Sequence, residues 1–503
     1  MSETSFDTLV EGNSAFVPIV PGAHPDPTIC CVGEDYYLAH SSFEYFPGVP
    51  LWHSRDLVSW TRIGHILTRR SQFVRGDARP SSGLYAGTLR HHDGRFWYVT
   101  TNVSDYLSGQ VLVHAEDPAG PWSDPVHVSG ALGIDPDIVW DEDGRCYLTW
   151  TALSANDGEG GILQAPLDTA TGKLLDQPYR VWQGTGEMGA VEGPHLYPID
   201  GHWYLVLAEG GTERGHAVTV ARAPHPAGPF TGCPGNPVLT HRSTSHPTQN
   251  TGHADLVRTT DGGWAAVYLG VRPQGPTPGF HVLGRETFLA GVDWTDEGWP
   301  VFDEGRYQVP VVDTAFEDRF DKAPVLNSRW VAPGGEPETL AYPVPDGSAG
   351  IQVRPGGLLC TRVQDLRWTA EAKIDGEGSF QLRMDHRHHY TLTVADGAVT
   401  ASARIGDLEV PVATAPAPNG TVVLRLAAQT PESPPLPLGD AGPDTIVLGF
   451  AGPDGQTVDL ARLDGRYLST EVASGFTGRV LALAATDPDR PALVRAVRYR
   501  PER

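Results

Sequence analysis

Three acidic residues stand in segments where proline and glycine restrict or turn the backbone. Asp26 lies between two prolines in HPDP, Asp135 precedes a proline in GIDPD, and Glu192 is followed by glycine and proline in VEGPHLY. Proline fixes its own φ angle and restricts the residue before it, so such side chains point in defined directions. A single acid before proline is usually a turn residue. Three acids at matching places in a repeated pattern indicate chemistry instead.

Carboxylates grouped in this way can hydrolyse a glycosidic bond. A protonated carboxylic acid assists the leaving oxygen, while an ionised carboxylate acts on the opposite face of the sugar. A separation of roughly 6.5–9.5 Å leaves room for a water molecule and inverts the product. A third carboxylate nearby raises the pKa of the acid by like-charge repulsion and keeps it protonated near neutral pH.

A two-part repeat positions these acids. A turn rich in Asp and Gly, followed by a strand containing aromatic residues, starts near positions 32, 91, 141, 197 and 259. A second strand pattern follows each copy, near positions 51, 111, 162, 219 and 288. Asp-Gly pairs suit tight hairpins, and five copies predict the blades of a five-bladed β-propeller. A β-sandwich with coincidental turns is the alternative. In a propeller, acids ahead of the first, third and fourth inner strands would converge at one mouth of the channel.

The repeat stops near residue 310, where alternating strands continue to the end of the chain. We therefore expect an all-β protein with an N-terminal tail (1–14), a five-bladed propeller (15–310) and a C-terminal, jelly-roll-like β-sandwich (311–503). A chain of 503 residues is too long for one hydrophobic core, which agrees with two domains. The strands of the sandwich do not reveal its role.

The overall charge limits the class of ligand. The formal net charge is −24, from 37 basic and 61 acidic residues, which argues against nucleic acids, anionic membranes and polyanionic substrates. A small neutral oligosaccharide is the expected partner. The sequence shows no secretory signal and no long apolar run. Its five cysteines are scattered, so free thiols in a reducing compartment and a cytoplasmic location are expected.

Several motifs together resemble one enzyme family. HPDPTIC, SSFEYFPGVPLWHSRDLVSW, GIDPDIVWDEDGRCYL, EGPHLY, AEGGTERGHAVTVARA, GHADLV and GRETFL follow one another along the chain. They are similar to family 43 of the glycoside hydrolases, in particular its β-xylosidase and α-L-arabinofuranosidase branch, which carries a C-terminal sandwich. The resemblance implies that Asp26 is the general base that activates water and Glu192 the general acid. It also implies that Asp135 tunes the pKa of the acid and helps to orient it.

The resemblance extends to the residues around the sugar. It implies that Arg285 holds hydroxyls of the terminal sugar, that Phe43 walls this subsite, and that His253 lies at the centre of the channel. Relatives often have Trp-Ala-Pro where this chain has Tyr85-Ala86-Gly87, and Tyr85 can still provide an apolar wall. Relatives more commonly begin the first motif with Asn where this chain has His24. Both departures concern which pentose fits.

Two further acids and a histidine tract were weighed against these candidates. Asp137 and Asp143 have the pattern of turn residues. The HRHHY tract (386–390) lacks acidic or cysteine ligands at zinc spacing and is interpreted as structural or exposed. No metal ligands are predicted and no cofactor is required. A structural cation in the channel remains a hypothesis that rests on His253.

The predicted function is an exo-acting, inverting β-D-xylosidase that releases terminal xylose from short xylo-oligosaccharides. An α-L-arabinofuranosidase or a dual-activity enzyme is the first alternative. A carbohydrate-binding propeller without catalysis is the alternative from another class. The sequence leaves open whether the chain forms a homo-oligomer and which linkage it prefers.

Overall fold

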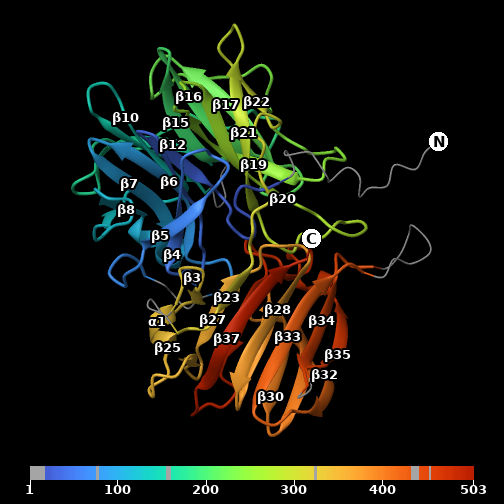
Figure 1. Cartoon of the computed structure of the whole chain (residues 1–503). Helices are drawn as coiled ribbons and strands as arrows, with labels where there is room; N and C mark the ends of the chain where they lie inside the picture. Colours follow the sequence, from blue (N-terminus) through green and yellow to red (C-terminus); the bar gives the residue numbers. More distant parts are fainter. Residues whose placement is uncertain are drawn as a thin grey trace, which may run out of the picture.

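The computed structural model describes residues 17–74, 79–153, 160–321, 326–431, 441–452 and 455–502. Their regular secondary structure is almost all β-strand, which confirms the all-β prediction. Figure 1 shows two groups of sheets, one formed by the first part of the chain and one by the last. The predicted tail (1–14) lies outside the described residues.

The first group contains five antiparallel sheets within the described part of the chain. The first contains β1 (Thr28–Val32), β2 (Asp35–Ala39), β4 (Gly48–Ser54) and β5 (Thr61–Leu67), and the second β6 (Leu84–His92), β7 (Arg95–Asn102), β8 (Gln110–Ala115) and β9 (Val126–Val128). The third contains β10 (Ile134–Trp140), β11 (Cys146–Ala152), β12 (Gly161–Asp168), β13 (Lys173–Leu174) and β14 (Tyr179–Trp182). The fourth contains β15 (Glu192–Ile199), β16 (His202–Glu209), β17 (Ala217–Ala223) and β18 (Thr231–Gly232), and the fifth β19 (Gln249–Arg258), β20 (Trp264–Val271), β21 (Glu286–Trp294) and β22 (Pro300–Asp303).

The repeated turns form where the sequence predicted them, one in each sheet. Asp93 and Gly94 connect β6 to β7 with φ angles of 50° and 73°, and Asp200 and Gly201 connect β15 to β16 with φ angles of 50° and 76°. Two consecutive left-handed residues match the twist of the flanking strands, which favours this turn in a hairpin. Local turn chemistry therefore forms the first hairpin of the second and fourth sheets.

The first strands of the five sheets lie beside one another around a common centre. β6 contacts β1 and β10, β15 contacts β10 and β19, and β19 contacts β1. Apolar side chains fill the spaces between neighbouring sheets; the cluster between the second and third sheets includes Trp97, Leu112, Leu148 and Trp150. Because all five first strands meet, residues at equivalent strand ends come together although they lie far apart in the sequence.

The second group is a sandwich of two sheets around one core. The larger sheet contains β23 (Phe316–Asp318), β25 (Ala341–Pro343), β26 (Ile351–Val353), β28 (Trp368–Asp375), β33 (Thr421–Gln429), β34 (Thr445–Ala451), β35 (Thr457–Asp464) and β37 (Ala492–Pro501). The other contains β27 (Leu358–Arg362), β29 (Gly378–Arg383), β30 (His388–Ala395), β31 (Ala398–Ile405), β32 (Leu408–Pro416) and β36 (Val480–Ala484). Buried and less buried residues alternate along β28, so one face of this strand packs into the core.

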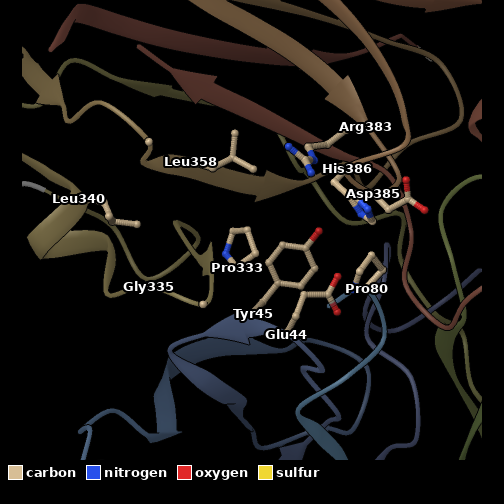
Figure 2. A pocket seen from close by; sticks show the side chains of 12 residues that line it. Glu44, Tyr45, Pro80, Pro333, Gly335, Leu340, Leu358, Arg383, Asp385 and His386 are labelled. Carbon is tan, nitrogen blue, oxygen red and sulfur yellow. The ribbon is translucent and has the colours of Figure 1, made fainter. Parts of the chain in front are cut away.

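Two short strands join the groups. β24 (Ala332–Pro333) pairs with β3 (Tyr45–Phe46) from the first sheet region. A cavity of about 310 Å³ lies beside this pair, and Figure 2 shows Glu44 and Tyr45 on one side and Arg383 on the other. Burial raises the pKa of Glu44 to about 7. The junction therefore includes a buried acidic group as well as apolar contacts.

Helical structure is scarce. The described residues include the 3₁₀ segments η3 (Val103–Ser108) and η4 (Gly465–Leu468) and the α-helices α1 (Pro337–Leu340) and α2 (Thr470–Ala473). Among the described residues, no helix has the length and apolarity needed to cross a membrane.

Candidate active site

Backbone irregularities at equivalent strand ends position the predicted site residues. The pairing between the first and second strands of a sheet is interrupted between Leu84 and Gly87, Ile134 and Asp137, Glu192 and His195, and Gly252 and Asp255. Asp135, Gly193 and His253 stand in these bulges with φ angles of 54°, 58° and 50°, and Asp26, with a φ of 54°, directly precedes Pro27 and β1. A bulge redirects a side chain out of the regular pleat. Four sheets thus direct side chains toward one region.

Asp26 is held as a carboxylate. It is 5% exposed, its Oδ1 accepts a hydrogen bond from Arg285 Nη1 at 2.7 Å, and its Oδ2 accepts one from Ser41 Oγ at 2.6 Å. His253 Nδ1 lies 3.8 Å from Oδ1. Burial by itself raises the pKa of Asp26, but these neighbours outweigh it, Arg285 most of all, so the pKa lies below its ordinary value.

Asp135 and Glu192 form a pair of neighbouring acids. The backbone amide of Gly193 donates to Asp135 Oδ2 at 3.2 Å, so the residue next to Glu192 anchors Asp135. Burial and then the charges of Glu192 and Asp26 raise the pKa of Asp135 well above its usual range. Burial and then Asp26 raise the pKa of Glu192 to about 7. The pair therefore retains a proton near neutral pH, whereas Asp26 does not.

Close packing against His253 explains why a glycine follows Glu192. Gly193 has a left-handed φ of 58°, and a Cβ at this position would lie 3.0 Å from the ring of His253. Burial lowers the pKa of His253 to about 3, so this ring is neutral when the acids function. His253 thus packs between Gly193 and Asp26 as a neutral polar neighbour.

Arg285 connects Asp26 to an aromatic wall. Its Nη1 also donates to Thr212 Oγ1 at 3.1 Å. Its guanidinium lies 5.8 Å from the ring centre of Phe43 and 5.5 Å from that of Phe476, within reach of cation–π attraction. The structure therefore brings Arg285 and Phe43 together with the acids, as the sequence predicted.

Phe476 comes from the sandwich and was missed by the sequence reasoning. Its ring stacks on Phe43 at 5.9 Å and meets the edge of Tyr85, also at 5.9 Å. Phe43 and Tyr85 contact each other at 5.3 Å. Nothing in the surrounding segment ASGFTG marks this residue, because only the packing of the sandwich against the sheets brings it here.

A hollow of about 570 Å³ opens beside this wall. Both groups of sheets line it, with Thr212 and Arg285 from the first group and Thr470, Glu471 and Phe476 from the sandwich. His281 Nδ1 lies 2.6 Å from Glu471 Oε1 across the boundary. The sandwich therefore forms one side of the hollow that adjoins Asp26 through Arg285.

The centre of the first five sheets holds a guanidinium. Arg90 donates from Nη1 to Asp255 at 3.0 Å and from Nη2 to Asp137 at 2.9 Å, and both acids are 0% exposed. Tyr197 also donates to Asp255, and Nη2 of Arg90 lies 3.3 Å from His195 Nδ1. These contacts lower the pKa of Asp255 to about 2.

This arrangement does not fit the channel cation proposed from His253. The guanidinium of Arg90 already supplies the positive charge that the two buried carboxylates require, and a metal ion beside it would be repelled. His253 faces Asp26, which is itself paired with Arg285. Neither group is a complete ligand set for a metal ion.

The turn assignment of Asp137 is wrong. Asp137 belongs to β10, and its Oδ2 accepts a hydrogen bond from the amide of Leu196 at 3.1 Å. Burial at the common centre requires a partner for its charge, and Arg90 provides it. Asp143 lies in a turn, as predicted.

Comparison with known protein families shows which family this chain belongs to. The family model described as "Glycosyl hydrolases family 43" matches residues 16–300, which are more than half of the chain. The chain belongs to glycosyl hydrolase family 43. A "Beta xylosidase C-terminal Concanavalin A-like domain" matches residues 353–500 of this family 43 protein. The chain is thus a member of a glycosidase family, as predicted.

Curated relatives of this family 43 chain include xylosidases and arabinosidases. A xylosidase/arabinosidase from Butyrivibrio fibrisolvens is 45% identical over 57% of this chain and 56% of its own length. A non-reducing end alpha-L-arabinofuranosidase from Bacteroides ovatus is 45% identical over 56% of this chain and 52% of its own length. The alignments therefore span about half the length of these relatives.

Solved structures match nearly the full length of the family 43 chain. A Bacteroides ovatus protein described as "Xyloglucan PUL GH43B" has a TM-score of 0.85 at 31% identity, covering 96% of this chain and 99% of its own. A xylan beta-1,4-xylosidase from Bacillus halodurans has a TM-score of 0.85 at 29% identity, with the same coverage. Both groups of sheets are therefore shared with family 43 structures.

Proposed function

We propose that this protein is an exo-acting, inverting glycosidase that releases terminal xylose from short, neutral xylo-oligosaccharides. One observation carries the proposal: the buried carboxyl group of Asp26 and the half-buried one of Glu192 have opposite protonation preferences. Arg285 holds Asp26 ionised, while burial and the charge of Asp26 keep Glu192 protonated up to about pH 7. A base and an acid that function at the same pH are what glycoside hydrolysis requires.

In the proposed reaction, Glu192 gives its proton to the glycosidic oxygen as the bond to the anomeric carbon breaks. A water molecule forms the new bond to that carbon from the opposite face and loses a proton to Asp26, so the product is inverted. Asp135 holds a proton beside Glu192 and is anchored by the amide of Gly193, so it helps to orient the acid. Arg285 keeps Asp26 ionised and lies where it can also bind a sugar hydroxyl through its fork of donors.

We interpret the five sheets as the blades of a five-bladed propeller (15–310), followed by the sandwich domain (311–503). The contacts among the first strands from β1 to β19 support a circular arrangement. Phe476 and Glu471 line the hollow beside Arg285, so the sandwich shortens the groove that a sugar chain could occupy. A short groove favours removal of terminal units.

An α-L-arabinofuranosidase, or an enzyme with both activities, is the second candidate. The relatives at 45% identity are named for arabinosidase activity as well as xylosidase activity. Tyr85, in place of the Trp expected from the family resemblance, stands against Phe43 and Phe476 and changes the shape of the apolar wall. A binding protein without catalysis is disfavoured because it has no need for separated pKa values at the three acids.

The experiment compares initial hydrolysis rates on an aryl β-D-xylopyranoside and an aryl α-L-arabinofuranoside. The parent protein, Glu192→Gln and the matched control Glu187→Gln are measured together; Glu187 is exposed on the segment that leads to Glu192. Faster cleavage of the xylopyranoside, abolished only in Glu192→Gln, supports the proposal. Faster cleavage of the arabinofuranoside supports the second candidate. A folded parent that cleaves neither substrate overturns both.

We also propose that the protein functions in the cytoplasm on imported oligosaccharides. All five cysteines are free thiols, four of them buried, which suits a reducing compartment. Fractionation of the native host followed by immunodetection tests this, and recovery in the extracellular medium contradicts it.

A further inference from the structure

A second group of ionisable side chains lies at the fifth sheet, outside the three acids. His241 and His246 stand in the segment that leads into β19, and Glu304 directly follows β22. One ligand atom from each of these three residues lies within 4.8 Å of the others. The sequence analysis did not identify this group, because Glu304 is remote from the histidines in the sequence.

His241 is oriented as a metal ligand would be. Its ring is 6% exposed; Nδ1 lies 2.7 Å from the backbone oxygen of Thr248, and Nε2 lies 2.8 Å from Glu304 Oε2. A carbonyl oxygen only accepts hydrogen bonds, so Nδ1 carries a proton. In the neutral ring, the lone pair of Nε2 then faces an anionic oxygen. The contact therefore requires a second proton on Nε2, and a metal ion that binds both atoms would displace that proton.

Two contacts orient the carboxylate of Glu304. The phenol of Tyr268, which is 0% exposed, donates to Glu304 Oε1 at 2.5 Å. Tyr268 therefore fixes one oxygen of the carboxylate and directs the other toward His241.

His246 adds a second imidazole to the group. Its ring centre lies 3.6 Å from that of His241, and its Nδ1 lies 3.0 Å from the same oxygen of Thr248. The amide of Thr248 also lies 3.2 Å from His246 Nδ1, so this ring has two tautomers. In the one with Nδ1 protonated, Nε2 carries a lone pair and can bind a metal.

We propose that His241, His246 and Glu304 bind one divalent transition-metal ion of the zinc class. Two imidazole nitrogens and one carboxylate oxygen, completed by water, form a tetrahedral set that zinc accepts, whereas magnesium and calcium prefer oxygen ligands. The backbone oxygen of Thr248 and the phenol of Tyr268 orient the ligands from outside, as partners of metal ligands commonly do.

The site is accessible and has a structural role. His246 lines a hollow of about 500 Å³ together with residues 243–245, which gives the ion a path from solvent and space for water. The ion ties the segment before β19 to the end of β22. Because β19 carries His253, the tie stabilises the fifth sheet without taking part in hydrolysis.

The test uses the full chain without an affinity tag, dialysed against chelator and titrated with Co²⁺ and, separately, Zn²⁺. We expect one equivalent of Co²⁺ with the visible absorption of a tetrahedral complex, displaced by one equivalent of Zn²⁺. Zn²⁺ should also raise the melting temperature. Tyr268→Phe, which retains all three ligands, should weaken binding about tenfold or more.

His246→Ala and Glu304→Gln should lose the cobalt spectrum and the zinc-dependent rise in melting temperature. His386→Ala is the matched control, because His386 is an exposed histidine of the HRHHY tract in the sandwich. The proposal is overturned if the parent shows no tetrahedral cobalt spectrum, or if His246→Ala binds as the parent does. A parent spectrum lost in His386→Ala but kept in His246→Ala also overturns it.

Discussion

Arg285 donates a hydrogen bond to Asp26 at 2.7 Å although 259 residues separate them in the sequence. This ion pair gives the two candidate catalytic carboxyl groups, Asp26 and Glu192, different pKa values. Asp26 has a guanidinium partner, whereas Glu192 has the charge of Asp26 as its neighbour and lies in a buried environment. The first predictions follow from this asymmetry.

The roles of Asp26 and Glu192 predict different dependence on the leaving group. Glu192→Gln should lower kcat on xylobiose by about 10²–10⁴-fold. The loss should be small on a dinitrophenyl xyloside, because that leaving group departs without a proton. Asp26→Asn should lower kcat on both substrates, since both need an activated water. Steady-state rates on the two substrates check this, and an equal loss in Glu192→Gln on both would contradict the assignment.

The pKa values predict the pH profile. Glu192 must be protonated, so kcat/KM should fall as pH rises through about 7, the value to which its pKa is raised. Asp26 must be ionised, and its lowered pKa places the acid limb below the usual 3.8. Asp135 has the more strongly raised pKa and is protonated when Glu192 titrates, so Asp135→Asn should leave the alkaline limb near pH 7. A limb moved to lower pH would contradict this, because it would show that Asp135 carries a charge when Glu192 titrates.

The contact of Phe476 with Phe43 and Arg285 predicts a contribution of the sandwich to substrate binding. Phe476→Ala should raise KM about tenfold, equivalent to about 1.4 kcal/mol, with a smaller change in kcat. The control is Tyr467→Ala, an aromatic residue of the sandwich that is 40% exposed. Michaelis–Menten kinetics on an aryl xyloside separate the two parameters. An unchanged KM in Phe476→Ala would place the sugar elsewhere.

The ion pairs of Arg90 with Asp137 and Asp255 predict a loss of stability that involves no metal ion. Arg90→Met leaves Asp137 and Asp255 buried without their cation, which should lower the free energy of unfolding by about 3–5 kcal/mol. Urea denaturation measures this, and chelator should not reproduce it.

The Arg90 effect should also depend on pH. The pKa of Asp255 is lowered to about 2 in the folded protein, against about 3.9 when unfolded. The stabilisation is therefore complete above about pH 4 and is lost as pH falls toward 2. The difference between the parent and Arg90→Met should shrink over that interval, and a constant difference would contradict the ion-pair explanation.

Much of the fold could be predicted because the signals are local. Asp93 and Gly94 are neighbours, and their preference for left-handed φ angles produces a hairpin wherever the chain continues as strands. The prolines around Asp26 restrict the backbone in the same direct way. Local geometry of this kind, repeated five times, was enough to predict sheets of similar construction and to select the three acids.

The sequence by itself determined the strands, the turns and which acids stand at strand ends, since these depend on neighbouring residues. Only the tertiary structure decided that Asp137 is a buried partner of Arg90 and that Phe476 faces Phe43. A buried charge requires a partner wherever the fold can supply one, and aromatic rings pack against whatever surface the two groups of sheets present. Such contacts join residues with no local signal, because burial is a property of the assembled molecule.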